Sequence, residues 1–289
     1  MKLKNTAALA LSAVLAFGLT ACGSAASPAV DSTVPDGDGD PTTLTVAMEC
    51  AYAPYNWTQN DDTNGAVQIR DSGDYAYGYD VIMAKKIGEA LGQNVQIVKL
   101  DWDSLIPAVT SGDVDCVIAG QSITAERAAQ VDFSDPYYYA SIVTLVKKDS
   151  KYADAKSVAD LDGATATSQL GTIWYDNCLP QIPNGNILAA QETAPAMLVA
   201  LNSGACDVVV TDRPTAQAAL VAYPDFTLLD FGGGDNDFQV SQEDINIGIS
   251  MKKGYTALRD AINEVLSGMT ADDYNDLMDE AIAAQPLSE

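Results

Sequence analysis

The sequence predicts an α/β protein with mainly parallel sheets, built from two similar halves. Strand-like apolar runs alternate with segments whose apolar residues recur at helical spacing, which is typical of chains that place helices between neighbouring strands. In addition, residues 105–118 return as residues 197–210 at a constant offset of 92 positions. Both copies indicate a helix, a glycine stop and a buried strand, so we expect each half to carry the same βαβ unit. The alternative is that helix-glycine-strand is simply a common arrangement in α/β proteins.

The first half begins with a strand, on which Leu44, Val46 and Met48 alternate with other residues. A helix should follow later, with Asp80 as its N-cap and Gly92 as its stop. The spacing of its apolar residues places them on one helix face. They are Val81, Ala84, Gly88 and Leu91.

Two further strands and a short helix complete this half. Residues 95–100 form the second expected strand, Asp103 caps a short helix that ends at Gly112, and residues 114–119 form the third strand. In the second half, residues 164–168 should form the corresponding first strand.

The equivalent strands of the repeat end at Gly120 and Asp212, one in each half. Ligands of open α/β sheets gather at the carboxyl ends of strands. Two such ends that face each other across a cleft would enclose a small molecule.

The N-terminus is typical of an exported lipoprotein. Two early lysines precede an apolar run at residues 7–19 that is too short for a stable membrane span, and this run ends in Leu-Thr-Ala-Cys at residues 19–22. We therefore expect a signal peptide at residues 1–21, a lipid on Cys22 and a flexible tether at residues 22–41, which is rich in Ser, Ala, Gly, Asp and Pro. The alternative is plain secretion with cleavage at the same point. No later apolar stretch is long enough to cross a bilayer.

Charge and cysteine content exclude several function classes. The formal net charge is −25, and loss of residues 1–21, which hold two lysines and no acid, would make it −27. Nucleic-acid binding is not expected at this charge. The chain has no histidine, and its later cysteines fit no zinc signature, so we expect no metal and no cofactor. These cysteines are Cys50, Cys116, Cys178 and Cys206. A disulfide between the last two and buried free thiols both remain open.

Arg127 is the first candidate ligand residue. It falls in the first turn of a helix that opens after the strand at 114–119, where the helix macrodipole favours anions. A cation there indicates an anion to be held. The backbone N–H groups around Ser122 and Thr124 point the same way, and a planar guanidinium can bind a carboxylate through two hydrogen bonds.

Four segments in order resemble the polar amino-acid solute-binding proteins of ABC importers. These are residues 51–55, 122–127, 132–137 and 210–212, and the resemblance extends from about residue 43 to about residue 277. It implies a two-lobe, periplasmic-binding-protein-like fold, with two mainly parallel sheets joined by a two-strand hinge. Lobe 1 would comprise residues 42–140 and 247–289, and lobe 2 residues 141–246. The crossings would lie near residues 140–143 and 245–249.

The resemblance also assigns the groups that every α-amino acid shares. Arg127 would bind the carboxylate, together with the Gln169–Ile173 segment through the N–H groups and hydroxyl at Thr172 and Ile173. Family members often carry a hydroxyl or a glycine at the position of Ile173, so only the backbone would act there. The alternative is that residues 169–173 form only a strand-to-helix turn, with no role in binding. The α-ammonium would bind Asp212, the Gly120 carbonyl and the Ser122 hydroxyl. An N-cap role would explain Asp212 equally well, and the two roles can coexist.

For the ligand side chain, the resemblance indicates Glu49, Tyr52 and Trp102. The two aromatic residues offer flat walls for stacking, although either could simply fill core space. A carboxylate at the end of a buried strand is costly unless it is paired, so Glu49 favours a cationic ligand end and disfavours an acidic one.

The expected function is a lipid-anchored extracytoplasmic receptor, not an enzyme, that binds a polar or basic L-amino acid and delivers it to the permease of an ABC importer. Arginine or lysine is favoured and glutamine comes next, and the protein should be a monomer held at the cell membrane by its lipid. A dehydratase-like enzyme on the same fold and a ligand-presenting sensor domain are the alternatives. The sequence leaves open the exact amino acid, the affinity, the importer and the role of the loop at residues 58–77.

Overall fold

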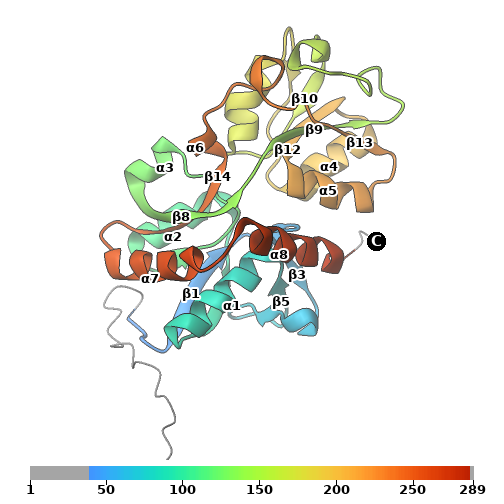
Figure 1. The fold of residues 1–289 in the computed structure, drawn as a ribbon. Coiled ribbons are helices and arrows are strands. Elements are labelled where there is room, and N and C mark those ends of the chain that lie inside the picture. Colours follow the sequence, from blue (N-terminus) through green and yellow to red (C-terminus); the bar gives the residue numbers. More distant parts are fainter. Residues whose placement is uncertain (1–38, 287–289) are drawn as a thin grey trace, which may run out of the picture. The chain divides into compact units, whose positions relative to one another are not determined.

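The computed structural model describes residues 39–286 (Figure 1). The predicted signal peptide, Cys22 and most of the predicted tether therefore lie outside the described residues. Within residues 39–286, no helix has both the length and the apolar character that a membrane span requires.

The first sheet has five strands in the order β6-β1-β7-β14-β8 (Figure 1). β1 (Thr43–Met48) pairs in parallel with β6 (Asn94–Lys99) and with β7 (Cys116–Val117). β14 (Asn246–Lys252) runs antiparallel to β7 and to β8 (Val131–Tyr139). A strand from near the C-terminus thus completes the sheet of the first half. The helices of this part are α1 (Tyr79–Leu91), α2 (Leu105–Ser111), α3 (Ala125–Gln130), α7 (Thr256–Ser267) and α8 (Ala271–Ala284).

The second sheet repeats this arrangement in the order β11-β10-β12-β9-β13. Its strands are β9 (Ile142–Lys147), β10 (Thr165–Thr167), β11 (Asn186–Ile187), β12 (Val208–Asp212) and β13 (Phe226–Leu229). β12 pairs in parallel with β10 and antiparallel with β9, just as β7 does with β1 and β14. Two helices, α4 (Ala194–Ser203) and α5 (Arg213–Ala222), flank β12 in the sequence. The mixed α/β fold with two five-stranded sheets confirms the predicted fold class.

The chain passes between the two sheets twice. β8 ends at Tyr139 and β9 begins at Ile142, while α6 (Gln242–Ile245) leads directly into β14 at Asn246. Both connections are shorter than the predicted crossings, because Ile142 and Asn246 already pair within their sheets.

Residues 51–77, which include the predicted loop, form a small four-stranded sheet in the order β2-β3-β5-β4. Its strands are β2 (Ala51–Tyr52), β3 (Asn56–Gln59), β4 (Val67–Gln68) and β5 (Tyr75–Tyr77). The segment predicted as a long loop at residues 58–77 therefore contains strands. Alternation such as that of Tyr75, Ala76 and Tyr77 could have indicated strands.

Three local predictions were wrong in detail. Gly78, and not Asp80, is the N-cap of α1, and Asp80 is fully buried in the first turn of that helix. Asp103 lies inside a short 3-10 turn, η2 (Trp102–Ser104), and caps neither this turn nor α2. The third strand of the first half contains only Cys116 and Val117. β1 forms the predicted first strand and is buried on both faces.

The four cysteines of the described chain are buried free thiols, so Cys178 and Cys206 form no disulfide. Across residues 39–286, no group of three or more His, Cys, Asp or Glu side chains could hold a metal ion. The remaining short helical turns are η1 (Thr63–Gly65), η3 (Val158–Leu161), η4 (Trp174–Cys178), η5 (Leu179–Gln181) and η6 (Gly234–Asn236).

Candidate ligand-binding site

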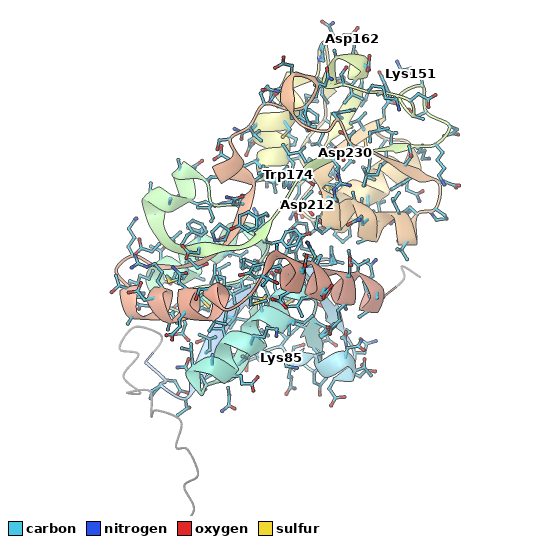
Figure 2. All side chains as sticks on the ribbon, viewed as in Figure 1. Lys85, Lys151, Asp162, Trp174, Asp212 and Asp230 are labelled. Carbon is cyan, nitrogen blue, oxygen red and sulfur yellow. The ribbon has the colours of Figure 1, made fainter. Side chains whose placement is uncertain are left out.

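Asp212, labelled in Figure 2, is the last residue of β12 and the N-cap of α5. Its carboxylate accepts hydrogen bonds from the Thr215 N–H (2.9 Å) and the Thr215 hydroxyl (3.0 Å), which confirms the N-cap interpretation. The same carboxylate accepts a 2.5 Å hydrogen bond from the Tyr52 hydroxyl, 160 positions away in the chain. Burial raises the pKa of Asp212 despite these donors. The site therefore contains a fully buried acid at the carboxyl end of a strand.

Arg127 is the third residue of α3, whose N-cap Thr124 accepts the Arg127 N–H at 3.3 Å. Its guanidinium donates to the Ser122 carbonyl (Nη1, 3.0 Å) and, across to the second half, to the Gly171 carbonyl (Nη2, 2.8 Å). The guanidinium carbon also lies 5.4 Å from the centre of the Trp102 ring. Burial lowers the pKa of Arg127. No carboxylate among the described side chains forms an ion pair with this cation, so its partners are carbonyl oxygens and a ring face.

Glu49 directly follows β1 and is only 4% exposed. Its carboxylate accepts hydrogen bonds from the Gln169 side-chain amide at 3.1 and 3.4 Å. Burial raises its pKa to about 7, because the cost of desolvation outweighs the stabilising bonds from Gln169. Glu49 and Gln169 thus link the first strands of the two halves at their carboxyl ends.

The predicted carboxylate segment follows β10. The Thr172 hydroxyl donates to the Gln169 carbonyl at 2.7 Å, which closes a tight turn before η4. The side chain of Ile173 is buried in the apolar core of the second sheet. Ile173 also lines the largest of the cavities described below, together with Arg127 and Thr172.

Three cavities adjoin these residues. A space of about 10 Å³, the size of one water, is lined mainly by predicted site residues. It is lined by Tyr52, Trp102, Gly120, Ser122, Arg127, Thr172 and Trp174. A whole amino acid fits there only if these side chains move apart.

A second cavity of about 340 Å³ lies beside Trp102 and has four carboxylates in its lining. Glu49 was predicted, whereas Asp101, Asp103 and Glu192 were not. Asp101 and Asp103 flank Trp102 in the sequence and could have been found from that position. Glu192 carries no sequence signal, because it comes from the turn before α4.

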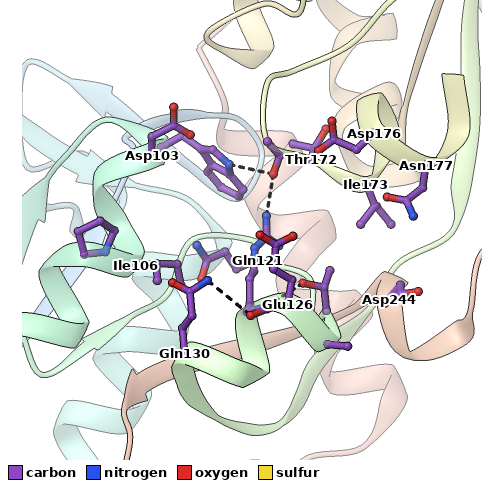
Figure 3. A pocket seen from close by; sticks show the side chains of 16 residues that line it. Asp103, Ile106, Gln121, Glu126, Gln130, Thr172, Ile173, Asp176, Asn177 and Asp244 are labelled. Atoms are coloured by element: carbon purple, nitrogen blue, oxygen red, sulfur yellow. Dashed lines mark hydrogen bonds between the residues drawn. The ribbon is translucent and has the colours of Figure 1, made fainter. Parts of the chain in front are cut away.

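The third and largest of these cavities, about 570 Å³, is lined in part by Arg127 and is shown in Figure 3. Its walls come from both halves and include Trp102, Glu126, Thr172, Asp176 and Asp244. Trp102 and Arg127 line both this cavity and the small central one. The structure therefore brings together all ten predicted site residues through these cavities and hydrogen bonds, with Ile173 in the wall of the largest cavity.

Comparison with known proteins identifies the family. The profile described as bacterial extracellular solute-binding proteins, family 3, matches residues 44–283. The arginine-binding extracellular protein ArtP of Bacillus subtilis is 33% identical over 171 residues, which cover 59% of this chain and 58% of ArtP. The glutamine-binding protein GlnH of the same organism is 32% identical over 217 residues, or 72% of this chain and 74% of GlnH.

A solved structure shows the same fold. The amino acid ABC transporter substrate-binding protein AbpA from Streptococcus pneumoniae, bound to L-arginine, superimposes with a TM-score of 0.69 and 25% identity. The match covers 84% of this chain and 95% of AbpA. The two-lobe arrangement of such binding proteins agrees with the two sheets described above.

Proposed function

Because this chain belongs to the bacterial extracellular solute-binding proteins of family 3, we propose that it is an extracytoplasmic receptor that binds an L-amino acid for an ABC importer. Binding occurs between lobe 1 (residues 42–140 and 247–289) and lobe 2 (residues 141–246), without chemical conversion of the ligand. The protein acts as a monomer.

One observation carries the proposal. Asp212 is buried and Arg127 is partly buried, their charges are opposite, and neither has an ion-pair partner among the described side chains. Buried charges are costly unless they are paired. An α-amino acid supplies both missing partners, a carboxylate for Arg127 and an ammonium for Asp212. The carbonyl of Gly171 and the hydroxyl of Tyr52 occupy these positions here, as neutral substitutes for the two ligand groups.

The ligand side chain is polar or basic, with arginine or lysine favoured and glutamine next. The cavity beside Trp102 supports this, because four of its eight lining residues are acidic. A guanidinium or ammonium in this cavity gains charge-assisted hydrogen bonds, and an arginine side chain also stacks on the indole. An acidic side chain meets repulsion.

Thermal shift with the common amino acids, followed by calorimetry, tests the receptor role. A ligand that binds only the folded state raises the melting temperature, by mass action. We expect the largest shifts for L-arginine and L-lysine, smaller ones for L-glutamine and none for L-aspartate. A tightest ligand of acidic type would contradict the assignment of Glu49 to the pocket.

The chain is attached to the cell membrane by a lipid on Cys22, after removal of residues 1–21. The apolar run at residues 7–19 and the Leu-Thr-Ala-Cys sequence support this. Cys22→Ala should release the protein from membranes or leave it as an unprocessed precursor. Mass spectrometry that finds a mature N-terminal Cys22 without lipid would disprove the anchor.

A further inference from the structure

Asp80 is a buried acid that the proposed ligand contacts do not use. It lies in the first turn of α1 with 0% of its surface exposed. One carboxylate oxygen accepts the Tyr137 hydroxyl at 2.6 Å, and the other accepts the Asn56 side-chain amide at 2.7 Å. Gly78 is the N-cap of α1, so Asp80 is not needed to cap this helix. Its two short hydrogen bonds to buried side chains therefore indicate another role. The question is what these two donors hold.

The two donors to Asp80 begin two branches of hydrogen bonds, and the branch through Tyr137 leads to Gly120. The Tyr137 oxygen also accepts the Gly120 N–H at 3.0 Å, so the hydroxyl links the carboxylate to the loop after β7. Gly120 has a φ of 63°, and a Cβ there would lie 2.9 Å from the Tyr52 ring and 3.1 Å from the Tyr55 ring. Only glycine fits this place, and its backbone is fixed by aromatic rings on one side and the Tyr137 hydroxyl on the other.

The branch through Asn56 leads to the turn at Glu49 and Cys50. The Asn56 side-chain oxygen accepts the N–H of Cys50 at 2.7 Å, while its amide donates to Asp80. Cys50 directly follows Glu49 and has a positive φ of 55°, an uncommon conformation for this residue type. Asn56 is fully buried. In the turn after Glu49, the backbone N–H of Cys50 therefore relies on the Asn56 side-chain oxygen as its acceptor.

We propose that Asp80 is a positioning residue, which holds the Gly120 loop through Tyr137 and the Glu49 turn through Asn56. The proposal rests on the receptor function above, in which Gly120 serves the α-ammonium and Glu49 the ligand side chain. One carboxylate then fixes the spacing between the two ends of the ligand site. It touches no ligand itself.

The two branches predict different losses. Tyr137→Phe removes the link to Gly120, so L-arginine and L-glutamine should both bind about tenfold more weakly, as expected for one lost hydrogen bond. Tyr79→Phe is the matched control. Tyr79 is equally buried, its ring stacks on Tyr137 at 5.7 Å, and its hydroxyl donates to the Tyr137 backbone carbonyl, away from Gly120. This control should keep both affinities within about twofold of wild type.

Asp80→Asn tests both branches at once, because an amide has one acceptor oxygen for two donors. Asp115→Asn is its control: Asp115 is also buried in the first half and accepts the Thr45 N–H and hydroxyl at 2.7 and 2.6 Å, but at the amino end of β7. By calorimetry well below the melting temperature, Asp80→Asn should lose more than about tenfold in affinity. Asp115→Asn should lose stability and keep its affinity. Equal affinities in the two folded variants would overturn the proposal.

Hydrogen exchange separates this inference from the receptor function, because it needs no ligand. In Tyr137→Phe the Gly120 amide should exchange at least about tenfold faster than in Tyr79→Phe, since only the former loses the Tyr137 hydroxyl as an acceptor of that N–H. Unchanged exchange at Gly120 would refute the positioning role. A wild-type protein that binds no amino acid would refute the receptor function, while faster exchange would still support the positioning role.

Discussion

The two copies of the helix-glycine-strand repeat agree at one end and differ at the other. Asp115 and Asp207, 92 positions apart, each accept the N–H of a threonine on the neighbouring first strand, Thr45 at 2.7 Å and Thr165 at 3.0 Å. Each also returns its own N–H to the carbonyl of the same threonine. The amino ends of β7 and β12 are therefore built alike.

The carboxyl ends of the same strands differ. At equivalent positions stand Gly120, packed under two tyrosine rings, and Asp212, which caps α5. The next helices begin at different distances, with α5 directly at Asp212 and α3 five residues after Gly120. The comparison indicates that one end of each unit maintains the fold and the other is specialised.

Asp212→Asn should have the largest effect. Asparagine caps a helix about as well as aspartate, so the fold should hold, while the charge that pairs with the ligand ammonium is lost. Loss of one partner of a buried charge costs roughly 3–5 kcal/mol, or more than about a hundredfold in affinity. Asp207→Asn, at the other end of β12, should bind normally in calorimetry. If Asp212→Asn and Asp207→Asn bind the ligand with similar affinity, the carboxyl end of β12 is not specialised for binding.

Arg127→Lys should also weaken binding strongly. Lysine keeps the charge but not the planar fork that reaches both the Ser122 and the Gly171 carbonyl, so a carboxylate cannot be held through two parallel bonds. We expect a loss of roughly tenfold to a hundredfold by calorimetry, and a larger loss in Arg127→Ala. Equal binding by wild type and Arg127→Ala would remove this residue from the site.

Glu49 should make binding of basic amino acids depend on pH. Its pKa is raised from 4.5 to about 7, so the ionised form that pairs with a cation grows as pH rises. Arginine affinity should increase roughly tenfold from about pH 6 to about pH 8, and Glu49→Gln should flatten this profile. Stability has the opposite sign: because the folded pKa is raised, the contribution of Glu49 is complete below about pH 4.5 and is lost as pH rises through about 7. An unchanged profile in Glu49→Gln would assign the pH dependence to another group.

The glycine stops should give the smallest effect. Gly112 and Gly204 end α2 and α4 in the left-handed conformation, with φ of 88° and 77°, and a Cβ added at either glycine would meet no atom closer than 3.4 Å. Alanine at either position should cost about 1–2 kcal/mol of unfolding free energy, measured by denaturant titration, and leave binding intact. Unequal costs would show that the two units are not structurally equivalent.

The sequence indicated those features that depend on neighbouring residues. Helix ends at Gly92, Gly112 and Gly204, the cap at Asp212 and the repeat itself all follow from local backbone rules, and the structure confirms them. The same local rules failed for Asp80 and Asp103. Asp80 has the right residue type for an N-cap, but its carboxylate is engaged by Asn56 and Tyr137, which come from other parts of the chain.

By itself, then, the sequence determined the α/β class, the duplication, the strong negative charge and the segments that carry the family resemblance. Only the tertiary structure decided which groups meet: the Tyr52 hydroxyl on Asp212, the Gln169 amide on Glu49, and Glu192 beside Asp101 in one cavity. It also decided that Glu49 titrates near neutral pH. The physical reason is that capping and turn formation act over a few residues, whereas desolvation and long-range hydrogen bonding depend on how distant segments pack.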